Sequence, residues 1–180
     1  MAVTIKQTEA IPEEYPDAPS GLSTAATALD KALIWQRIEA YVSWRWSERG
    51  VVWIVEGSGQ WEAPLSPTTI TKAEIWRGGG WEELTLPAAP LGGFMLSGDG
   101  PYRFTATVGE DEADVPVSVK EAFRRLAEYS AQSKGKAGAR SERIGAGSIS
   151  LSHTRSASWM AQAMENSGAG DLLRKWRKPH

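Results

Sequence analysis

The charge of this chain changes sign near residue 134. Residues 134–180 hold nine Lys or Arg and three Asp or Glu, a net charge of +6, whereas residues 1–133 hold 11 basic and 19 acidic side chains, a net charge of −8. The final stretch also holds six Gly, seven Ser and seven Ala. It therefore has little apolar surface to offset the entropy cost of ordering. We predict an acidic folded body followed by a flexible basic C-terminal tail.

Sparse hydrophobic residues occur in this tail at helical spacings. They fall into two groups, which are Trp159, Met160 and Met164, and then Leu172, Leu173 and Trp176. Apolar anchors on a loose basic segment are typical of a segment that folds upon a partner. A solvated, poorly packed terminus is the alternative interpretation.

Length and composition limit the protein class. About 100 to 150 residues is the commonest domain size, so 180 residues suit one body plus an extension. The sequence has no cysteine, which excludes disulfides, thiolate catalysis and cysteine-ligated zinc. No apolar run approaches the roughly 20 residues of a membrane span, and the N-terminus lacks a signal-peptide pattern. We expect a soluble protein that is used without export.

Hydrophobic periodicity predicts two amphipathic helices. The first spans residues 23–49, and the Ser23 hydroxyl is placed to cap its N-terminus. The second follows Pro116, which suits a first helical turn, and Ser118 and Glu121 fit a capping box.

Between the helices, short runs rich in β-branched and aromatic residues predict a small antiparallel β-meander. The expected strands are 51–55, 68–76, 81–86, 94–96 and 102–108. The last four are expected to pair as two successive hairpins around glycine-containing turns. The sequence thus predicts an α+β fold with three parts: an extended N-terminal segment (1–21), a helix, β-meander and helix body (22–133) and the tail (134–180).

No residue pattern specifies a catalytic or metal site. The two histidines, His153 and His180, both lie in the expected tail, which suits neither a metal cluster nor a Ser-His-Asp triad. The glycine-rich stretches complete no dinucleotide or phosphate-loop motif. Acidic pairs such as Glu82-Glu83 have polar neighbours, as a solvated surface does. We expect no enzyme activity, no metal and no cofactor.

Nine tryptophans are present, and seven of them lie between Trp35 and Trp81. Neighbours such as Arg45-Trp46 and Trp76-Arg77 pair a ring with a cation, as proteins that bind single strands do. The acidic body opposes phosphate binding. We interpret most of these rings as core or interface residues. A Trp-rich module that binds nucleic acid or polysaccharide, with the tail as a phosphate-binding arm, is the alternative function.

Four stretches in a fixed order carry a family resemblance. They are residues 86–91 (LPAAPL), the helix of residues 115–129 that begins at a proline, residues 141–150 (SERIGAGSIS) and residues 172–179 (LLRKWRKP). Over residues 22–179 the chain resembles the head-tail connector proteins of tailed phages and gene transfer agents. More narrowly, it resembles the adaptor, or head-completion, proteins that lie beneath the portal.

This resemblance implies a structural protein of the virion that is assembled in the host cytoplasm and located at the head-tail interface. It implies a homo-oligomeric ring, usually a dodecamer, that surrounds the channel for genomic double-stranded DNA and contacts the DNA non-specifically. The other implied partners are the portal protein and a stopper or tail-completion protein. A negatively charged channel lining would repel DNA phosphates and let the DNA slide.

The resemblance further implies that residues 144–179 grip the portal. Three hydrophobic residues near the end would be anchors, and the neighbouring cations would pair with an acidic portal surface. The expected portal-binding residues are Ile144, Ile149, Leu151, Trp159, Leu172, Leu173, Arg174, Lys175, Trp176, Arg177 and Lys178. A ring that presents many such arms would bind far more tightly than one arm.

Overall fold

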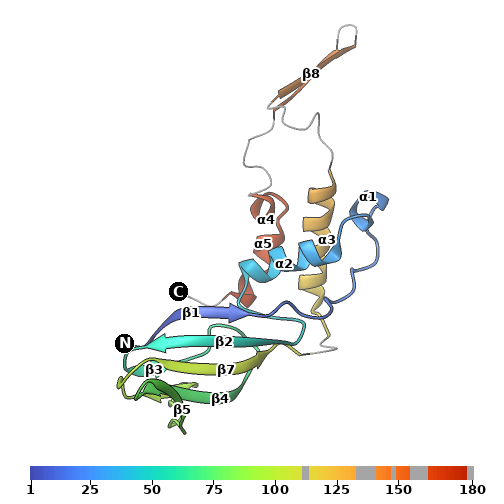
Figure 1. Cartoon of the computed structure of the whole chain (residues 1–180). Helices are drawn as coiled ribbons and strands as arrows, with labels where there is room; N and C mark the ends of the chain where they lie inside the picture. The colour runs from blue at the N-terminus through green and yellow to red at the C-terminus, as the bar shows by residue number, and fades with distance from the viewer. Residues whose placement is uncertain (111–113, 133–140, 147–148, 155–161, 178–180) are drawn as a thin grey trace. The chain divides into compact units, whose positions relative to one another are not determined.

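The computed structural model describes residues 1–110, 114–132, 141–146, 149–154 and 162–177 (Figure 1). It contains both helices and antiparallel sheets, so the predicted α+β class is confirmed. The chain divides into two compact units. Residues 1–16 and 43–114 form one, which we call the sheet unit, and residues 17–42 and 115–177 form the other, the helical unit. The expected single body over residues 22–133 is therefore replaced by two units.

A five-stranded antiparallel sheet with the order β1-β2-β7-β4-β5 forms the sheet unit (Figure 1). Its strands are β1 (Val3–Glu9), β2 (Arg49–Glu56), β4 (Thr68–Arg77), β5 (Gly80–Glu83) and β7 (Tyr102–Val108). Two further short strands, β3 (Gly59–Trp61) and β6 (Phe94–Leu96), pair with each other. All five predicted strand regions contain a strand, although the one expected over residues 81–86 ends at Glu83.

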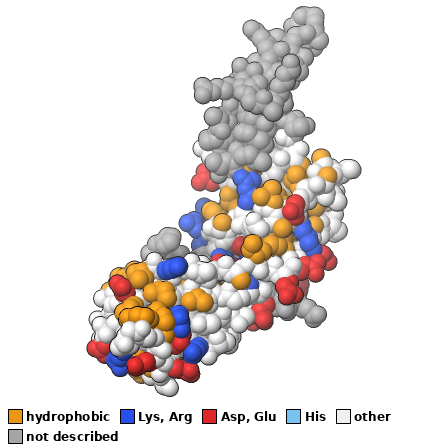
Figure 2. All heavy atoms as spheres, in the orientation of Figure 1, with side chains coloured by type: hydrophobic (Ala, Val, Ile, Leu, Met, Phe, Trp, Pro, Cys, Tyr) orange, Lys and Arg blue, Asp and Glu red, His pale blue; other side chains and the backbone are white. Residues whose placement is uncertain are grey.

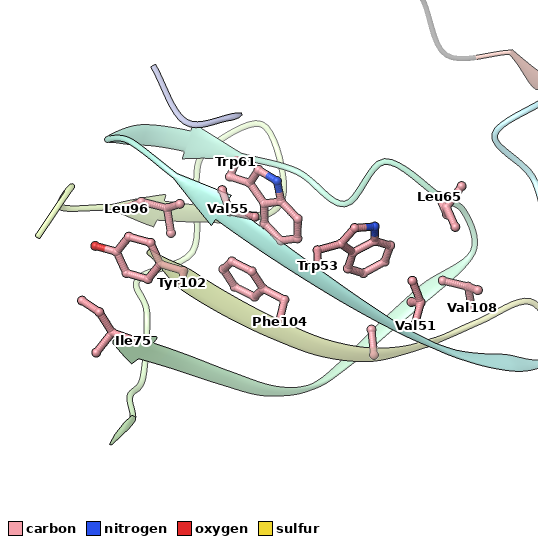
Figure 3. Packing of buried hydrophobic residues seen from close by; sticks show 11 residues of the cluster. Val51, Trp53, Val55, Trp61, Leu65, Ile75, Leu96, Tyr102, Phe104 and Val108 are labelled. Atoms are coloured by element: carbon pink, nitrogen blue, oxygen red, sulfur yellow. The ribbon is translucent and has the colours of Figure 1, made fainter. Parts of the chain in front are cut away.

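Alternation of large apolar residues along β2 and β7 determines which face of the sheet is buried. Val51, Trp53 and Val55 on β2 lie on the same face as Tyr102 and Phe104 on β7, and all are at most 2 % exposed (Figure 3). The Trp61 ring stacks on that of Phe104, with centroids 4.1 Å apart.

Two buried indole N–H groups in this core, those of Trp53 and Trp61, have partners. Trp53 Nε1 donates to Gln7 Oε1 at 2.8 Å, and Trp61 Nε1 donates to Thr4 Oγ1 at 2.9 Å. A buried donor without a partner costs free energy, so these hydrogen bonds allow the large rings to be buried without that cost. The interpretation of most tryptophans as core residues is confirmed for Trp35, Trp46, Trp53 and Trp61, all of which are buried.

Strand pairing differs from the expected meander in two places. The N-terminal segment was expected only to be extended, yet its first part is a strand of the sheet, since β1 pairs with β2 from Val3↔Glu56 to Glu9↔Val51. Its prolines begin only after the strand, at Pro12, so they do not prevent pairing. The expected hairpin of β6 with β7 is also wrong, because β6 pairs with β3 while β7 lies between β2 and β4.

Charged side chains attach β1 to the rest of the sheet unit. Arg45 donates to Glu9 through Nε at 2.6 Å and Nη2 at 3.0 Å, and Arg49 Nη1 donates to the same carboxylate at 3.4 Å. The Arg49 guanidinium also lies over the Tyr15 ring, 5.5 Å from its centroid. Both arginines are 7 % exposed, so their charges require this carboxylate nearby.

The helical unit contains α1 (Thr24–Thr27), α2 (Lys31–Tyr41), α3 (Val117–Ala131), α4 (Ala163–Asn166), α5 (Ala169–Leu172) and the 3₁₀ turn η1 (Arg174–Trp176). The antiparallel strands β8 (Ser141–Ala146) and β9 (Ile149–Thr154) also belong to it. Trp35 of α2 packs on Phe123 of α3 with ring centroids 5.1 Å apart, so these two helices pack together.

Helix boundaries differ from the predicted ones. Ser23 caps α1 as expected, since its Oγ accepts from Ala26 N at 3.2 Å. The helix predicted over residues 23–49 is instead two helices, because the Asp30 carboxylate caps a new start by accepting from Ala32 N at 2.9 Å. The chain turns extended at Val42 and then enters the sheet unit.

The start of α3 also differs from the prediction. Pro116 is its N-cap and makes no side-chain cap bond, so the capping box expected of Ser118 and Glu121 is wrong. The Glu121 carboxylate instead accepts from Arg124 at 2.5 Å and from Arg125 at 3.0 Å. These are the short-range pairs of an exposed helix face.

Candidate interaction surfaces

The C-terminal residues 162–177 are folded against α3. Ala163, Ala169 and Leu173 are at most 1 % exposed, and α4 and α5 both contact α3. The prediction of a flexible tail is therefore corrected for this stretch. Small residues were read as poor core formers, yet they allow the backbone to approach closely. A Cβ added at Gly170 would lie only 3.0 Å from the Tyr41 Oη.

Aromatic and polar contacts hold both ends of this segment within the helical unit. Asn166 Nδ2 donates to the Tyr129 Oη at 3.1 Å. The Arg177 guanidinium lies over the Tyr41 ring, 4.8 Å from its centroid, and Arg177 Nη1 is 3.5 Å from the Tyr41 Oη. Leu173 is therefore fixed by contacts on both sides of it in the sequence.

The structure brings four of the predicted portal-binding residues together at the end of this segment. Arg174, Lys175 and Arg177 are exposed, and Trp176 beside them is half-buried. The Lys175 Nζ lies 5.1 Å from the centroid of the Trp176 ring, and the Arg174 Nε lies 3.4 Å from the Asp171 carboxylate. We call Arg174, Lys175 and Arg177 the basic turn.

The other predicted portal-binding residues have different positions. Leu173 is fully buried, so its proposed role as an exposed anchor is corrected, and Leu172 is half-buried. Ile144 pairs with Leu151 across β8 and β9, and Ile149 pairs with Ala146. Trp159 and Lys178 lie outside the described residues, as do Met160 and the 155–161 stretch.

A second surface lies on the face of the five-stranded sheet opposite its core. It consists of Lys72, Glu74 and Trp76 on β4, Trp81 and Glu83 on β5, and Arg103 on β7. We call this set the tryptophan face. Glu74 is paired directly with Arg103 and with Glu83, and Trp76 with Trp81, so the side chains share one side of the sheet. Hydrophobic side chains reach the surface of the sheet unit among charges of both signs (Figure 2).

Glu74 is the central acceptor of the tryptophan face. Arg103 donates to its two oxygens through Nε at 2.6 Å and Nη2 at 2.7 Å, and Lys72 Nζ donates at 2.8 Å. The carboxylate is buried, and the hydrogen bonds from Arg103 and then Lys72 lower the pKa of Glu74 to about 2. The hydrogen bond to Glu74 in turn raises the pKa of Arg103. Glu74 is therefore ionised at any physiological pH.

Ring contacts continue outward from this ion pair. The Arg103 guanidinium lies 4.5 Å from the centroid of the Trp81 ring, and Trp81 packs edge-to-face on Trp76 with centroids 5.3 Å apart. Trp76 is 42 % exposed. A buried carboxylate thus orients an arginine, which orients one indole, which supports a second indole at the surface.

The cation next to Trp76 in the sequence, Arg77, is not the one that contacts this pair of rings. Adjacent residues of a strand point to opposite faces, so Arg77 is not on the tryptophan face and instead contacts Asp99 at 3.4 Å. The signal that identifies the face is the i, i+2 spacing of Glu74 with Trp76 and of Trp81 with Glu83 around the Gly78-Gly79 turn. The distant Arg103 has no local signal.

Two kinds of feature are absent from the part of the chain that the structure describes. No group of three or more His, Cys, Asp or Glu is placed to hold a metal ion. Among the same residues, no helix has the length and apolar character that crossing a membrane requires. Comparison with protein-family models, with curated proteins and with solved structures finds no match to this chain.

Proposed function

We propose that this chain is a structural head-tail adaptor of a virion. In this proposal, copies of it form a ring beneath the portal, and the ring joins the DNA-filled capsid to the tail around the DNA exit channel. The basic turn docks on the portal. The supports are the resemblance of residues 22–179 to adaptor proteins and the exposure of three cations on a folded C-terminal turn.

The single observation that carries the proposal is that a buried residue holds the basic turn in place. Leu173 is fully buried directly before Arg174 and Lys175, both of which are exposed. A turn that is already folded pays less ordering entropy on docking than a free arm would. Arginine and lysine on such a turn favour an acidic partner surface through charge-assisted hydrogen bonds.

Ring formation would multiply this modest contact. One basic turn offers few contacts, whereas a ring that presents many copies raises the effective concentration of every further contact. The sheet unit would contribute to ring contacts and to an acidic channel lining that repels phosphate.

Charge reversal of the basic turn tests the proposal. R174E/K175E changes two exposed side chains, while K6E reverses one exposed charge on β1 of the sheet unit as the control. The purified full-length protein is titrated onto the immobilised portal protein of the same genome at low and high salt. We expect R174E/K175E to weaken binding at least tenfold, on the order of 1.4 kcal/mol or more.

The salt dependence of binding and the thermal stability of each variant are measured in the same experiment. Wild-type binding should weaken as salt rises, because screening acts on exposed charges. Circular dichroism should show the same unfolding midpoint for both variants, since their side chains are at the surface. Equal portal affinity of R174E/K175E and wild type would refute the assignment of the basic turn.

A further inference from the structure

We infer that the tryptophan face binds an uncharged oligosaccharide, with Trp76 as the ring on which a sugar stacks. This binding site is separate from the adaptor role and rests on different residues. Three properties of the face support it: an exposed and rigid indole, hydrogen-bonding groups of both kinds on the same face, and a net charge of zero.

The indole of Trp76 is both exposed and held in place. Tryptophan is usually well buried in proteins, whereas Trp76 is 42 % exposed. The edge-to-face contact with Trp81 fixes its ring, and Trp81 is itself fixed by the Arg103 guanidinium. A rigid ring loses little side-chain entropy when a ligand covers it. The C–H face of a pyranose provides the flat apolar surface that such a ring accepts.

Donors and acceptors for sugar hydroxyls lie on the same face of the sheet as the Trp76 ring. The Lys72 side chain is 43 % exposed and the Glu83 side chain is 71 % exposed, with 3.8 Å between the Nζ and Oε2 atoms. A sugar hydroxyl both donates and accepts, so an exposed ammonium next to an exposed carboxylate can satisfy both of its functions. An apolar protein surface has no hydroxyl groups that need both a donor and an acceptor.

The charges of the tryptophan face cancel. Lys72 and Arg103 are balanced by Glu74 and Glu83. Nucleic acids require clustered positive charge, because phosphate neutralisation supplies most of their binding free energy. A neutral face with an exposed ring therefore favours an uncharged polyhydroxylated chain over a polyphosphate.

Neighbouring residues extend this surface across the strands. Ile54 on β2 is paired with Arg103, and Thr105 follows on the same side of β7; both are half-buried. The tryptophan face and these two neighbours together run from β5 across β4 and β7 to β2. This extent suits a saccharide chain that lies across the sheet, with one unit on Trp76 and further units over Thr105 and Ile54.

The test uses the full-length protein and five neutral hexasaccharides: cello-, chito-, malto-, manno- and xylohexaose. Isothermal titration calorimetry measures binding, and intrinsic tryptophan fluorescence follows it. We expect at least one hexasaccharide to bind with a Kd below about 1 mM. W76A should weaken that binding at least tenfold, whereas W76F should recover part of the affinity because it keeps an aromatic ring.

M95A is the matched control, because Met95 is an exposed apolar residue of β6, outside the tryptophan face. It should leave saccharide affinity unchanged, and the thermal unfolding of W76A should remain close to that of wild type. R174E/K175E should also retain saccharide binding, and W76A should retain portal binding, which separates failure of this inference from failure of the adaptor proposal.

Three outcomes would overturn the inference. The first is that none of the hexasaccharides binds at about 1 mM. The second is that wild type and W76A bind them equally. The third is that single-stranded oligothymidylate binds more tightly than any hexasaccharide and loses affinity in W76A, which would assign the face to nucleic acid.

Discussion

Leu173→Ala tests whether the C-terminal segment is part of the folded helical unit. Leu173 is fully buried, between the contact of Asn166 with Tyr129 and that of Arg177 with Tyr41. Replacement of a buried leucine by alanine removes its transfer free energy and leaves a cavity, at a cost of about 2–5 kcal/mol. A residue on a flexible tail would cost almost nothing, so the two descriptions of this segment differ by a measurable amount.

The position of Leu173 determines where in that range the cost should fall. Its segment has helices of only four residues, so it can shift partly into the space left behind. We therefore expect about 2–3 kcal/mol for the helical unit, which corresponds to a fall in its Tm of about 8–24 °C for a unit of this size.

Fluorescence and circular dichroism measured against urea would report the change. Trp35 and Trp176 lie in the helical unit, and the ellipticity at 222 nm reports chiefly on α2 and α3 of the same unit. Leu172→Ala is the control, because Leu172 is only half-buried and should cost less than half as much. The reasoning would be refuted if the free energies of unfolding of L173A and L172A, obtained from urea denaturation, agreed within about 0.5 kcal/mol.

Three further predictions concern single contacts. Gly170→Ala should lower the Tm of the helical unit, because the new Cβ would lie 3.0 Å from the Tyr41 hydroxyl. A calorimetric Tm equal to that of wild type would contradict the close packing. Glu74→Gln should cost about 1–3 kcal/mol at pH 7, since Arg103 loses a charged acceptor. The lowered pKa of Glu74 means that this stabilisation is complete above pH 4.5 and is lost as pH falls toward about 2, so urea midpoints of wild type and E74Q should converge on acidification. The hydrogen bonds from the Ser23 backbone N–H and then its hydroxyl lower the pKa of Glu128. Ser23→Ala removes the hydroxyl bond and the cap of α1, so it should destabilise at neutral pH, and the part that depends on Glu128 should shrink as pH falls below 4.5; an effect of the same size at every pH would argue against this contact.

Elements with a strong local signal were predictable from the sequence. The β4–β5 hairpin has two glycines, Gly78 and Gly79, with φ of 56° and 87°, which is the turn that a tight hairpin requires. The helix α3 has one continuous apolar face, and Val119, Ala122, Phe123 and Leu126 on it are all at most 2 % exposed. In both cases short-range sequence determines the structure.

Long-range pairing left no comparable signal. Nothing in residues 94–108 indicates that β6 pairs with β3 while β7 pairs with β2 and β4, because each choice satisfies the same alternation. Composition was misleading at the C-terminus for a related reason. Ala169 and Gly170 bury little area themselves, yet their small size lets α5 pack against α3 and bury Leu173.

The same difficulty affects the tryptophan face. Its tryptophans and acids are visible in the sequence, but the residue that links them is Arg103, which is 22 positions beyond Trp81. Only the placement of β7 beside β4 brings it to Glu74. Adjacent pairs in the sequence therefore indicated the right residue types and the wrong partners.

The order of the two units along the chain decides which experiments can separate folding from binding. Residues 1–16 belong to the sheet unit, 17–42 to the helical unit, 43–114 to the sheet unit and 115–177 to the helical unit. Neither unit is a contiguous fragment, so neither can be obtained by simple truncation. Removal of residues after 133 would also uncover the face of α3 that α4 and α5 contact. A truncated protein that failed to bind a portal would then show only that its helical unit was damaged. Substitutions at exposed side chains, such as R174E/K175E and W76A, avoid this ambiguity because they leave both cores intact.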